Sequence, residues 1–128
     1  MRKIRVSEPN DSNDTSAFKG LLKRATTEML VLLTLRDKPM YIYEMMNMIK
    51  NKSNGYLQFN TLYIAIYRLK ELKFVEESAI TLTDDNRTRV YYSITETGRD
   101  YLNNMIKEYE NFSGIMGEII YSDNAKIS

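Results

Sequence analysis

The stretch NTLYIAIYRLKELKFV, residues 60–75, has the apolar periodicity of an amphipathic helix followed by the start of a strand. Its apolar residues recur at steps of three and four and so predict one buried face. That face holds Leu62, Ala65, Ile66, Leu69 and Leu72. The opposite face holds Asn60, Ile64, Tyr67 and Glu71, flanked by Thr61, Tyr63 and Arg68. Asn60 or Thr61 is the expected N-cap. An outer face that carries Ile64 and Tyr67 indicates a binding surface.

Two helices are expected before this stretch. From Phe18 onward, apolar residues recur at helical steps until about Asp37, where Pro39 disfavours helical geometry in the preceding residue. The segment YIYEMMNMIKNKSNG, residues 41–55, predicts a short amphipathic helix closed by the turn-forming pair Asn54 and Gly55. Residues 1–16 are largely polar and turn-forming, so they are expected to form a flexible N-terminal arm.

A β-hairpin and a long helix are expected after it. Two segments, FVEESAITL (residues 74–82) and RVYYSI (residues 89–94), are rich in β-branched and aromatic residues, and the turn-prone TDDNRT lies between them. Thr95 is the expected cap of the final helix, whose apolar residues form a heptad seam typical of a helix packed along another helix. The seam consists of Leu102, Met105, Tyr109, Phe112, Met116 and Ile119.

Three short helices followed by a hairpin are the layout of a winged helix-turn-helix, in which the third helix enters the major groove of DNA. The expected fold is therefore mainly α with a small two-stranded β-hairpin. It divides into the arm at residues 1–16, a DNA-binding domain at residues 17–94 and a C-terminal dimerisation helix at residues 95–121. Dimerisation is favoured for the last helix because a heptad seam has few partners within so small a domain.

The composition restricts the chemistry. The 128 residues include no cysteine and no histidine, which removes disulfides, thiolate ligands and the commonest general base. No spacing typical of a metal site or a phosphate loop is present, so no enzyme, cofactor or metal is expected. No apolar run is long enough to span a bilayer and no secretory signal begins the chain. The cytoplasm is therefore the expected location.

The outer face of the third helix suits DNA. Asn60 can pair with an adenine edge, Ile64 can contact a thymine methyl group, and tyrosine hydroxyls can bond phosphates. Arg68 on this helix adds positive charge, and so do Arg87 and Arg89 near the hairpin tip, although the net charge is only +1. Neutralising phosphates with such cations is the main source of affinity for DNA.

The same residues would also suit different roles. The face that carries Ile64 and Tyr67 could pack against another element of the chain, a second subunit or a protein partner. Arg87 and Arg89 could simply solvate the hairpin tip. A winged-helix module that binds protein and not DNA is therefore the alternative function.

Several segments together resemble the PadR family of transcriptional regulators. The triplet Thr61, Leu62 and Tyr63, followed by Arg68 and Leu69, is similar to the recognition helix of that family. RVYYSITETGRDYL, residues 89–102, is similar to its wing strand and the start of its final helix, and TEMLVLLTL and YIYEMMNMI fit its first two helices. The similarity extends over residues 20–120. The chain departs from the family's usual glycine or proline at Ile42, Asn60, Ile64 and Lys73.

The resemblance implies a homodimeric bacterial repressor of the compact subfamily, in which a single C-terminal helix from each subunit builds the dimer. It implies contacts to double-stranded DNA by Thr61, Tyr63 and Arg68 on the recognition helix and by Arg87 and Arg89 on the wing. Two-fold symmetry then predicts an inverted-repeat operator. Family members often respond to small aromatic or drug-like effectors. Some hold them between tryptophans, which this chain lacks, so tyrosines and methionines would have to substitute.

Overall fold

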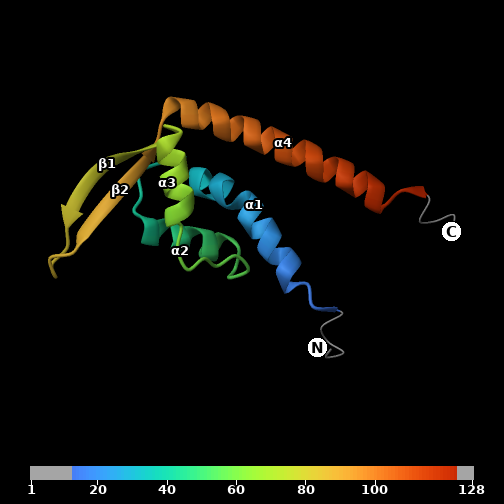
Figure 1. Ribbon diagram of the computed structural model, residues 1–128, viewed down its shortest axis with the longest axis horizontal. Coiled ribbons are helices and arrows are strands. Elements are labelled where there is room, and N and C mark those ends of the chain that lie inside the picture. The colour runs from blue at the N-terminus through green and yellow to red at the C-terminus, as the bar shows by residue number, and fades with distance from the viewer. Residues whose placement is uncertain (1–12, 124–128) are drawn as a thin grey trace, which may run out of the picture.

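Within residues 13–123, the part of the chain that the computed structural model describes, four helices and one β-hairpin follow one another. The order is α1 (Ser16–Thr34), α2 (Ile42–Lys52), α3 (Tyr63–Glu71), β1 (Val75–Leu82), β2 (Thr88–Ile94) and α4 (Glu96–Ile120) (Figure 1). This is the expected mainly helical fold with a two-stranded antiparallel wing. Most of the expected N-terminal arm lies outside the described residues.

The core lies where the three shorter helices and the first turns of α4 meet the base of the hairpin. Each element contributes side chains from one face, because every third or fourth residue of a helix and alternate residues of a strand share a direction. The buried apolar residues are Val31, Leu32, Leu35, Met40, Met45, Ile49, Leu62, Ala65, Ile66, Leu69, Val75, Tyr92, Ile94 and Leu102. Burial of this surface, worth about 25 cal/mol per Å², is the main force that stabilises the domain.

The hairpin is anchored at its base and extends away from the core. β1 and β2 pair from Val75 opposite Ile94 to Leu82 opposite Thr88, with an irregularity between residues 77 and 79. A third segment joins the base, because Met40 and Tyr92 exchange backbone hydrogen bonds of 3.0 and 2.9 Å. The loop before α2 therefore fixes the direction in which the wing leaves the domain (Figure 1).

The start of α3 differs from the expectation. The helix begins at Tyr63, and its N-cap is Leu62 instead of Asn60 or Thr61. Leu62 is buried, so packing into the core decides where the chain enters the helix. The Thr61 hydroxyl still accepts a hydrogen bond of 3.2 Å from the Tyr63 N–H. At the other end, Leu72 is 43% exposed and does not belong to the buried face that the period predicted.

The first two helices end close to the expected positions. α1 ends at Thr34, slightly before the expected Asp37. α2 ends at Lys52 and is followed by the expected turn, in which Asn54 and Gly55 have positive φ angles of 53° and 83°.

Two lysines of α1 hold the loop that leads into α3. The Lys19 ammonium donates a hydrogen bond to the carbonyl oxygen of Tyr56 at 2.8 Å, and the Lys23 ammonium donates to that of Gln58 at 2.6 Å. Lys19 also lies over the Tyr56 ring, 3.7 Å from its centre. These contacts tie the loop before α3 to α1, which also packs against α2, α3 and α4.

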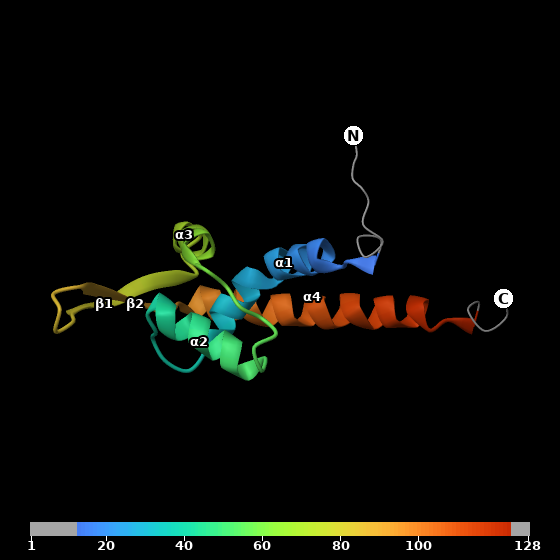
Figure 2. The same cartoon turned by 90° about the horizontal axis from the view of Figure 1, so that it is seen from below.

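α4 begins on the core and then leaves it. The Thr95 hydroxyl accepts a hydrogen bond from the Gly98 N–H at 3.0 Å, which confirms the expected cap. Leu102 is buried, whereas every side chain from Lys107 to Met116 is exposed. The last turns of α4 and the first turn of α1 lie at the end of the molecule opposite the hairpin tip (Figures 1 and 2). No helix in residues 13–123 has the length and apolarity needed to cross a membrane.

Candidate nucleic-acid interface

A groove of about 700 Å³ lies between the hairpin, the start of α2 and the approach to α3. Asn60, Thr61 and Tyr63 line it from the side of α3, and Arg87 and Arg89 line it from the hairpin. All five residues are among the DNA contacts predicted from the sequence. The fold thus brings two separate segments of the chain to one surface that combines aromatic rings, hydroxyls and guanidinium groups.

The other three predicted contacts lie on α3 outside this groove. Ile64 is 84% exposed and borders a second hollow between α1 and α3. Tyr67 is 64% exposed, and Arg68 points toward α1. The predicted contacts therefore form two sets, which we call the groove set (Asn60, Thr61, Tyr63, Arg87 and Arg89) and the outer-face set (Ile64, Tyr67 and Arg68).

Arg68 is not a free cation. Its Nε lies 3.0 Å from a carboxylate oxygen of Glu28 on α1, and the arginine side chain remains 55% exposed. An ion pair this accessible to water stabilises the fold by no more than about 1 kcal/mol. Arg68 can therefore still turn a guanidinium edge toward a phosphate, but Glu28 reduces the charge it presents.

The two arginines of the hairpin have different partners. The Nε of Arg87 donates to a carboxylate oxygen of Asp85 at 3.1 Å. Hydrogen bonds from the Thr83 hydroxyl and then from Arg87 hold the pKa of Asp85 below its usual value, so this carboxylate stays charged. Arg89 instead lies over the ring of Tyr41, 4.6 Å from its centre. Asp85 thus offsets one of the two wing charges and leaves the other intact.

An ion pair also joins α3 to the wing. The Lys70 ammonium of α3 donates to a carboxylate oxygen of Glu77 on β1 at 2.7 Å, and this hydrogen bond raises the pKa of Lys70. Tyr92, which lies opposite Glu77 in the hairpin, is buried, and its burial raises the pKa of its hydroxyl. The angle between α3 and the wing is therefore fixed by a charged contact outside the core and by an aromatic ring within it.

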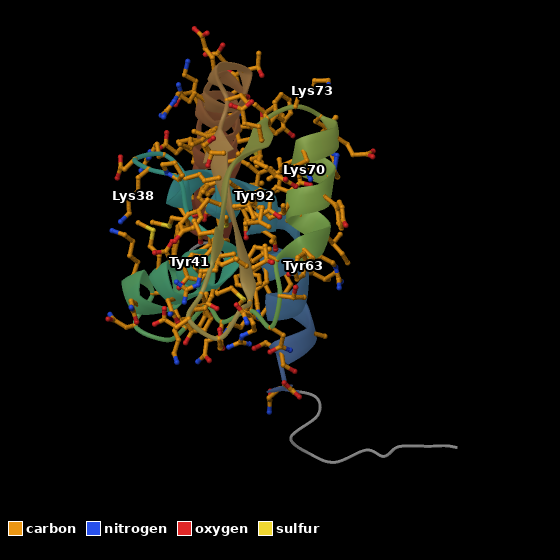
Figure 3. The ribbon with its side chains drawn as sticks, turned by 90° about the vertical axis from the view of Figure 1, so that its left-hand side faces the viewer. Lys38, Tyr41, Tyr63, Lys70, Lys73 and Tyr92 are labelled. Atoms are coloured by element: carbon orange, nitrogen blue, oxygen red, sulfur yellow. The ribbon has the colours of Figure 1, made fainter. Side chains whose placement is uncertain are left out.

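Sequence analysis missed two tyrosines of the groove. Tyr41 and Tyr43 both line it from the start of α2, and Tyr43 is 60% exposed. Viewed toward the hairpin, Tyr41 lies on the side of α2 and Tyr63 on the side of α3 (Figure 3). The signal was present in the sequence, because a short helix that turns Ile42 and Met45 inward leaves the residues on either side of Ile42 near the surface.

Residues 13–123 contain no cluster of three or more His, Cys, Asp or Glu side chains that could hold a metal ion. Cations, tyrosines and small polar groups make up much of the groove lining, and such side chains contact phosphates and base edges in protein–DNA complexes.

Comparison with known proteins identifies the family and supports the fold. The profile of the transcriptional regulator PadR-like family matches residues 31–104, more than half of the chain. The chain belongs to the PadR-like family. Transcriptional regulation by DNA binding is what this family does, so this PadR-like protein is a DNA-binding regulator and not an enzyme.

Similar proteins come from several bacteria. An uncharacterized protein from Lysinibacillus sphaericus is 30% identical over 95 residues, which cover 73% of this chain and 86% of the relative. A PadR family transcriptional regulator from Eggerthella lenta matches with a TM-score of 0.72 at 22% identity, over 92% of this chain and 97% of that one. A transcriptional regulator from Clostridium thermocellum matches with a TM-score of 0.67 at 23% identity, over 76% and 95% of the two chains. Both structures share the fold expected from the sequence.

Proposed function

We propose that this PadR-like regulator is a repressor that binds an inverted-repeat operator as a homodimer. The observation that carries the proposal is the groove, which sets Arg87 and Arg89 of the wing opposite Asn60, Thr61 and Tyr63 at the start of α3. A DNA backbone that follows this groove meets guanidinium groups on one side and hydroxyls on the other, while α3 enters the adjacent major groove.

The two sets of contacts have different roles in this proposal. The groove set binds phosphates and so supplies affinity that does not depend on sequence. Asn60 is the exception, because its amide can also pair with an adenine edge where α3 begins. The outer-face set reads bases, with Ile64 against a thymine methyl group and Tyr67 beside it. Arg68 binds a phosphate or a base once it turns away from Glu28.

The proposed dimer surface lies at the opposite end of the protomer. Leu102 is 1% exposed and Met105 packs partly against the protomer's own core, so we leave both out of this surface. The large apolar residues that are exposed on α1 and α4 are Phe18, Leu21, Leu22, Tyr109, Phe112, Ile115, Met116, Ile119 and Ile120. Exposed apolar side chains that gather on neighbouring helices are typical of a subunit contact.

Dimerisation through α4 keeps both wings free, since the hairpin tip and the ends of α1 and α4 are at opposite ends of the molecule (Figures 1 and 2). The two recognition helices of the dimer then bind half-sites that lie about one helical turn apart, or a multiple of that distance. Such a regulator would act in the cytoplasm, beside the chromosome.

A small aromatic effector is part of the proposal. Tyr109 and Met116 on the exposed part of α4 are large, adaptable side chains that can hold a flat apolar ligand in the absence of tryptophan. A ligand there would change the angle between subunits and hence the spacing of the recognition helices. If ligands that bind the dimer leave its DNA affinity unchanged, this part of the proposal is wrong.

The alternative is a winged-helix module that binds a protein through α3. The 84% exposure of Ile64 and the neighbouring Tyr67 favour it, because an apolar side chain this open also suits a protein partner.

One set of variants separates the two functions. For a DNA regulator, Arg87→Ala combined with Arg89→Ala weakens binding to every duplex and lowers the salt slope by about one for each phosphate that is no longer neutralised. For a protein-binding module these changes have little effect, whereas Ile64→Asp abolishes binding of the partner.

A base analogue tests the role of Ile64. Deoxyuridine lacks the methyl group of thymidine, so its substitution at the contacted base should weaken wild-type binding and leave the Ile64→Ala variant unaffected. Equal losses of affinity in both proteins would mean that Ile64 does not read this methyl group.

A further inference from the structure

The two wing arginines provide a comparison within one hairpin. Arg87 is bound to the Asp85 carboxylate at 3.1 Å, and its side chain is 82% exposed. Arg89 is exposed as well, but its guanidinium carbon lies 4.6 Å from the centre of the Tyr41 ring. Both arginines line the same groove. One is therefore paired with an opposite charge, and the other is held by an uncharged aromatic face.

The Tyr41 ring is itself held in place. It packs against the Tyr91 ring in an edge-on contact, with 5.4 Å between centres and 71° between planes. The Tyr41 backbone N–H donates to the Glu44 carboxylate at 3.2 Å. The preceding residue, Met40, is bridged to β2 by two backbone hydrogen bonds. Tyr41 thus occupies a defined position between α2 and the base of the wing, and Arg89 rests on it.

These partners affect the charge in different ways. A carboxylate offsets the charge of a guanidinium and occupies one of its N–H donors. An aromatic face attracts the cation through its quadrupole, but it carries no net charge and leaves the N–H groups at the guanidinium edge available. An arginine held in this way also loses less side-chain freedom when it binds a phosphate, because part of that freedom is already lost.

We infer that Tyr41 is a positioning residue for DNA binding, which presents Arg89 to a phosphate in the groove, and that Arg89 contributes more to affinity than Arg87. This inference rests on the proposed DNA-binding role of the groove. It assigns a role to the residue that precedes α2, which lies outside both α3 and the wing.

The first test is a double-mutant cycle, measured by fluorescence anisotropy with a labelled duplex from upstream of the protein's own gene and with an unrelated duplex of equal length. Tyr41→Leu should weaken binding to both duplexes by about two- to five-fold per wing, the range expected for an exposed cation–π contact. In the Arg89→Ala background, Tyr41→Leu should have no further effect. In the Arg87→Ala background, it should keep its full effect, which makes Arg87→Ala the matched control.

The conservative variant Tyr41→Phe provides a second test in the same binding experiment. Tyr41→Phe keeps the aromatic face and should retain wild-type affinity and salt slope. If Tyr41→Phe is as weak as Tyr41→Leu, the hydroxyl acts in place of the ring face and the inference is wrong. If Tyr41→Leu costs as much affinity in the Arg89→Ala background as in the wild type, Tyr41 only supports the fold, and the inference is again overturned.

A readout in the free protein separates this inference from the proposed function. The ring current of Tyr41 should shift the side-chain proton resonances of Arg89 upfield in the wild type and in Tyr41→Phe, and this shift should vanish in Tyr41→Leu. Absence of the shift in the wild type would remove the contact on which the inference depends. A normal shift together with no DNA binding at low salt would overturn the proposed function, and the positioning role with it.

Discussion

Gly98 lies so close to the carbonyl oxygen of Phe74 that a Cβ atom at residue 98 would stand 2.1 Å from that oxygen. The same carbonyl accepts a hydrogen bond of 3.0 Å from the Thr95 N–H, and the Thr95 hydroxyl donates to the carbonyl of Lys73 at 2.8 Å. The first turn of α4 is therefore bonded to the turn between α3 and the wing at a distance that leaves no room for a side chain. This junction connects the part of the molecule proposed to bind DNA to the helix proposed to form the dimer.

The close approach predicts that Gly98→Ala is strongly destabilising. Backbone atoms cannot move aside without breaking the Thr95 hydrogen bonds, so we expect a loss of about 2–4 kcal/mol in the free energy of unfolding, as for other overpacked or strained sites. Urea denaturation measures it. Gly114→Ala on the same helix is the control, because no atom lies within 4 Å of its added Cβ, and it should be neutral or stabilising by up to about 1 kcal/mol. Equal effects of the two changes would mean that the junction can accommodate a side chain at residue 98.

The turn that carries Phe74 also contains a strained residue. Lys73 has a φ angle of 65°, in the left-handed region that glycine adopts with little penalty. We therefore expect Lys73→Gly to raise the free energy of unfolding by about 0.5–1 kcal/mol in spite of the greater freedom of the unfolded chain. Lys73→Ala removes the same charge but keeps the strain, so it should not stabilise. If the glycine and alanine variants have the same free energy of unfolding, the strain at this position is negligible.

Phe112 is predicted to lie in the subunit contact. Its side chain is 62% exposed in the protomer, and Ile80 on the wing, with 63% exposure, is a matched control at the other end of the molecule. Phe112→Glu would bury a charge in an apolar contact and should shift the protein from dimer to monomer in sedimentation velocity experiments. Ile80→Glu should remain dimeric. A wild-type protein that sediments as a monomer at micromolar concentration would exclude the proposed dimer.

Tyr92 predicts a pH dependence of stability at alkaline pH. It is 7% exposed, and burial, followed by the nearby Glu77 carboxylate, raises the pKa of its hydroxyl. Below about pH 10 the hydroxyl is neutral in both states, so its contribution is fully present. Above that pH the unfolded chain ionises while the native state must keep the proton, so stability is lost as the pH rises toward the folded-state pKa.

Tyr92→Phe lacks this ionisation. The wild type should therefore lose unfolding free energy relative to the variant as the pH rises above about 10, whereas the difference between the two proteins should stay constant at lower pH. Urea denaturation at several pH values checks it. A difference that also stays constant above about pH 10 would mean that Tyr92 titrates alike in both states.

The periodicity of the sequence was sufficient to predict the elements of the fold and much of the site. The outer positions of the recognition helix followed from its buried face, so the exposure of Ile64 and Tyr67 is confirmed. The start of α3 did not follow, because Asn60 and Thr61 are good N-caps by type while the burial of Leu62 decides the entry point. The N-cap propensity of Asn60 and Thr61 therefore has less influence on the start of α3 than core packing has.

The ion pairs between residues distant in the sequence could not be predicted from periodicity. Arg68 meets Glu28, forty positions earlier in the chain, and Lys70 meets Glu77 across a turn, so the free charge of each depends on the assembled fold. The heptad seam likewise did not predict which of its residues are buried within the protomer. Its period continues unchanged from Leu102 onward, yet Leu102 is buried in the protomer while Phe112 is exposed, because the seam does not indicate which helix covers it.

The most direct test of DNA recognition is the affinity of the wild-type protein for a labelled duplex from immediately upstream of its own gene, compared with a scrambled duplex. Fluorescence anisotropy between about 50 and 200 mM salt gives both the affinity and its salt slope. The proposed regulator should bind the upstream duplex on the order of a thousand-fold more tightly than the scrambled one, with an affinity that falls steeply as salt rises. Failure to bind either duplex at the lowest salt would contradict the proposal that the groove between α3 and the wing holds DNA.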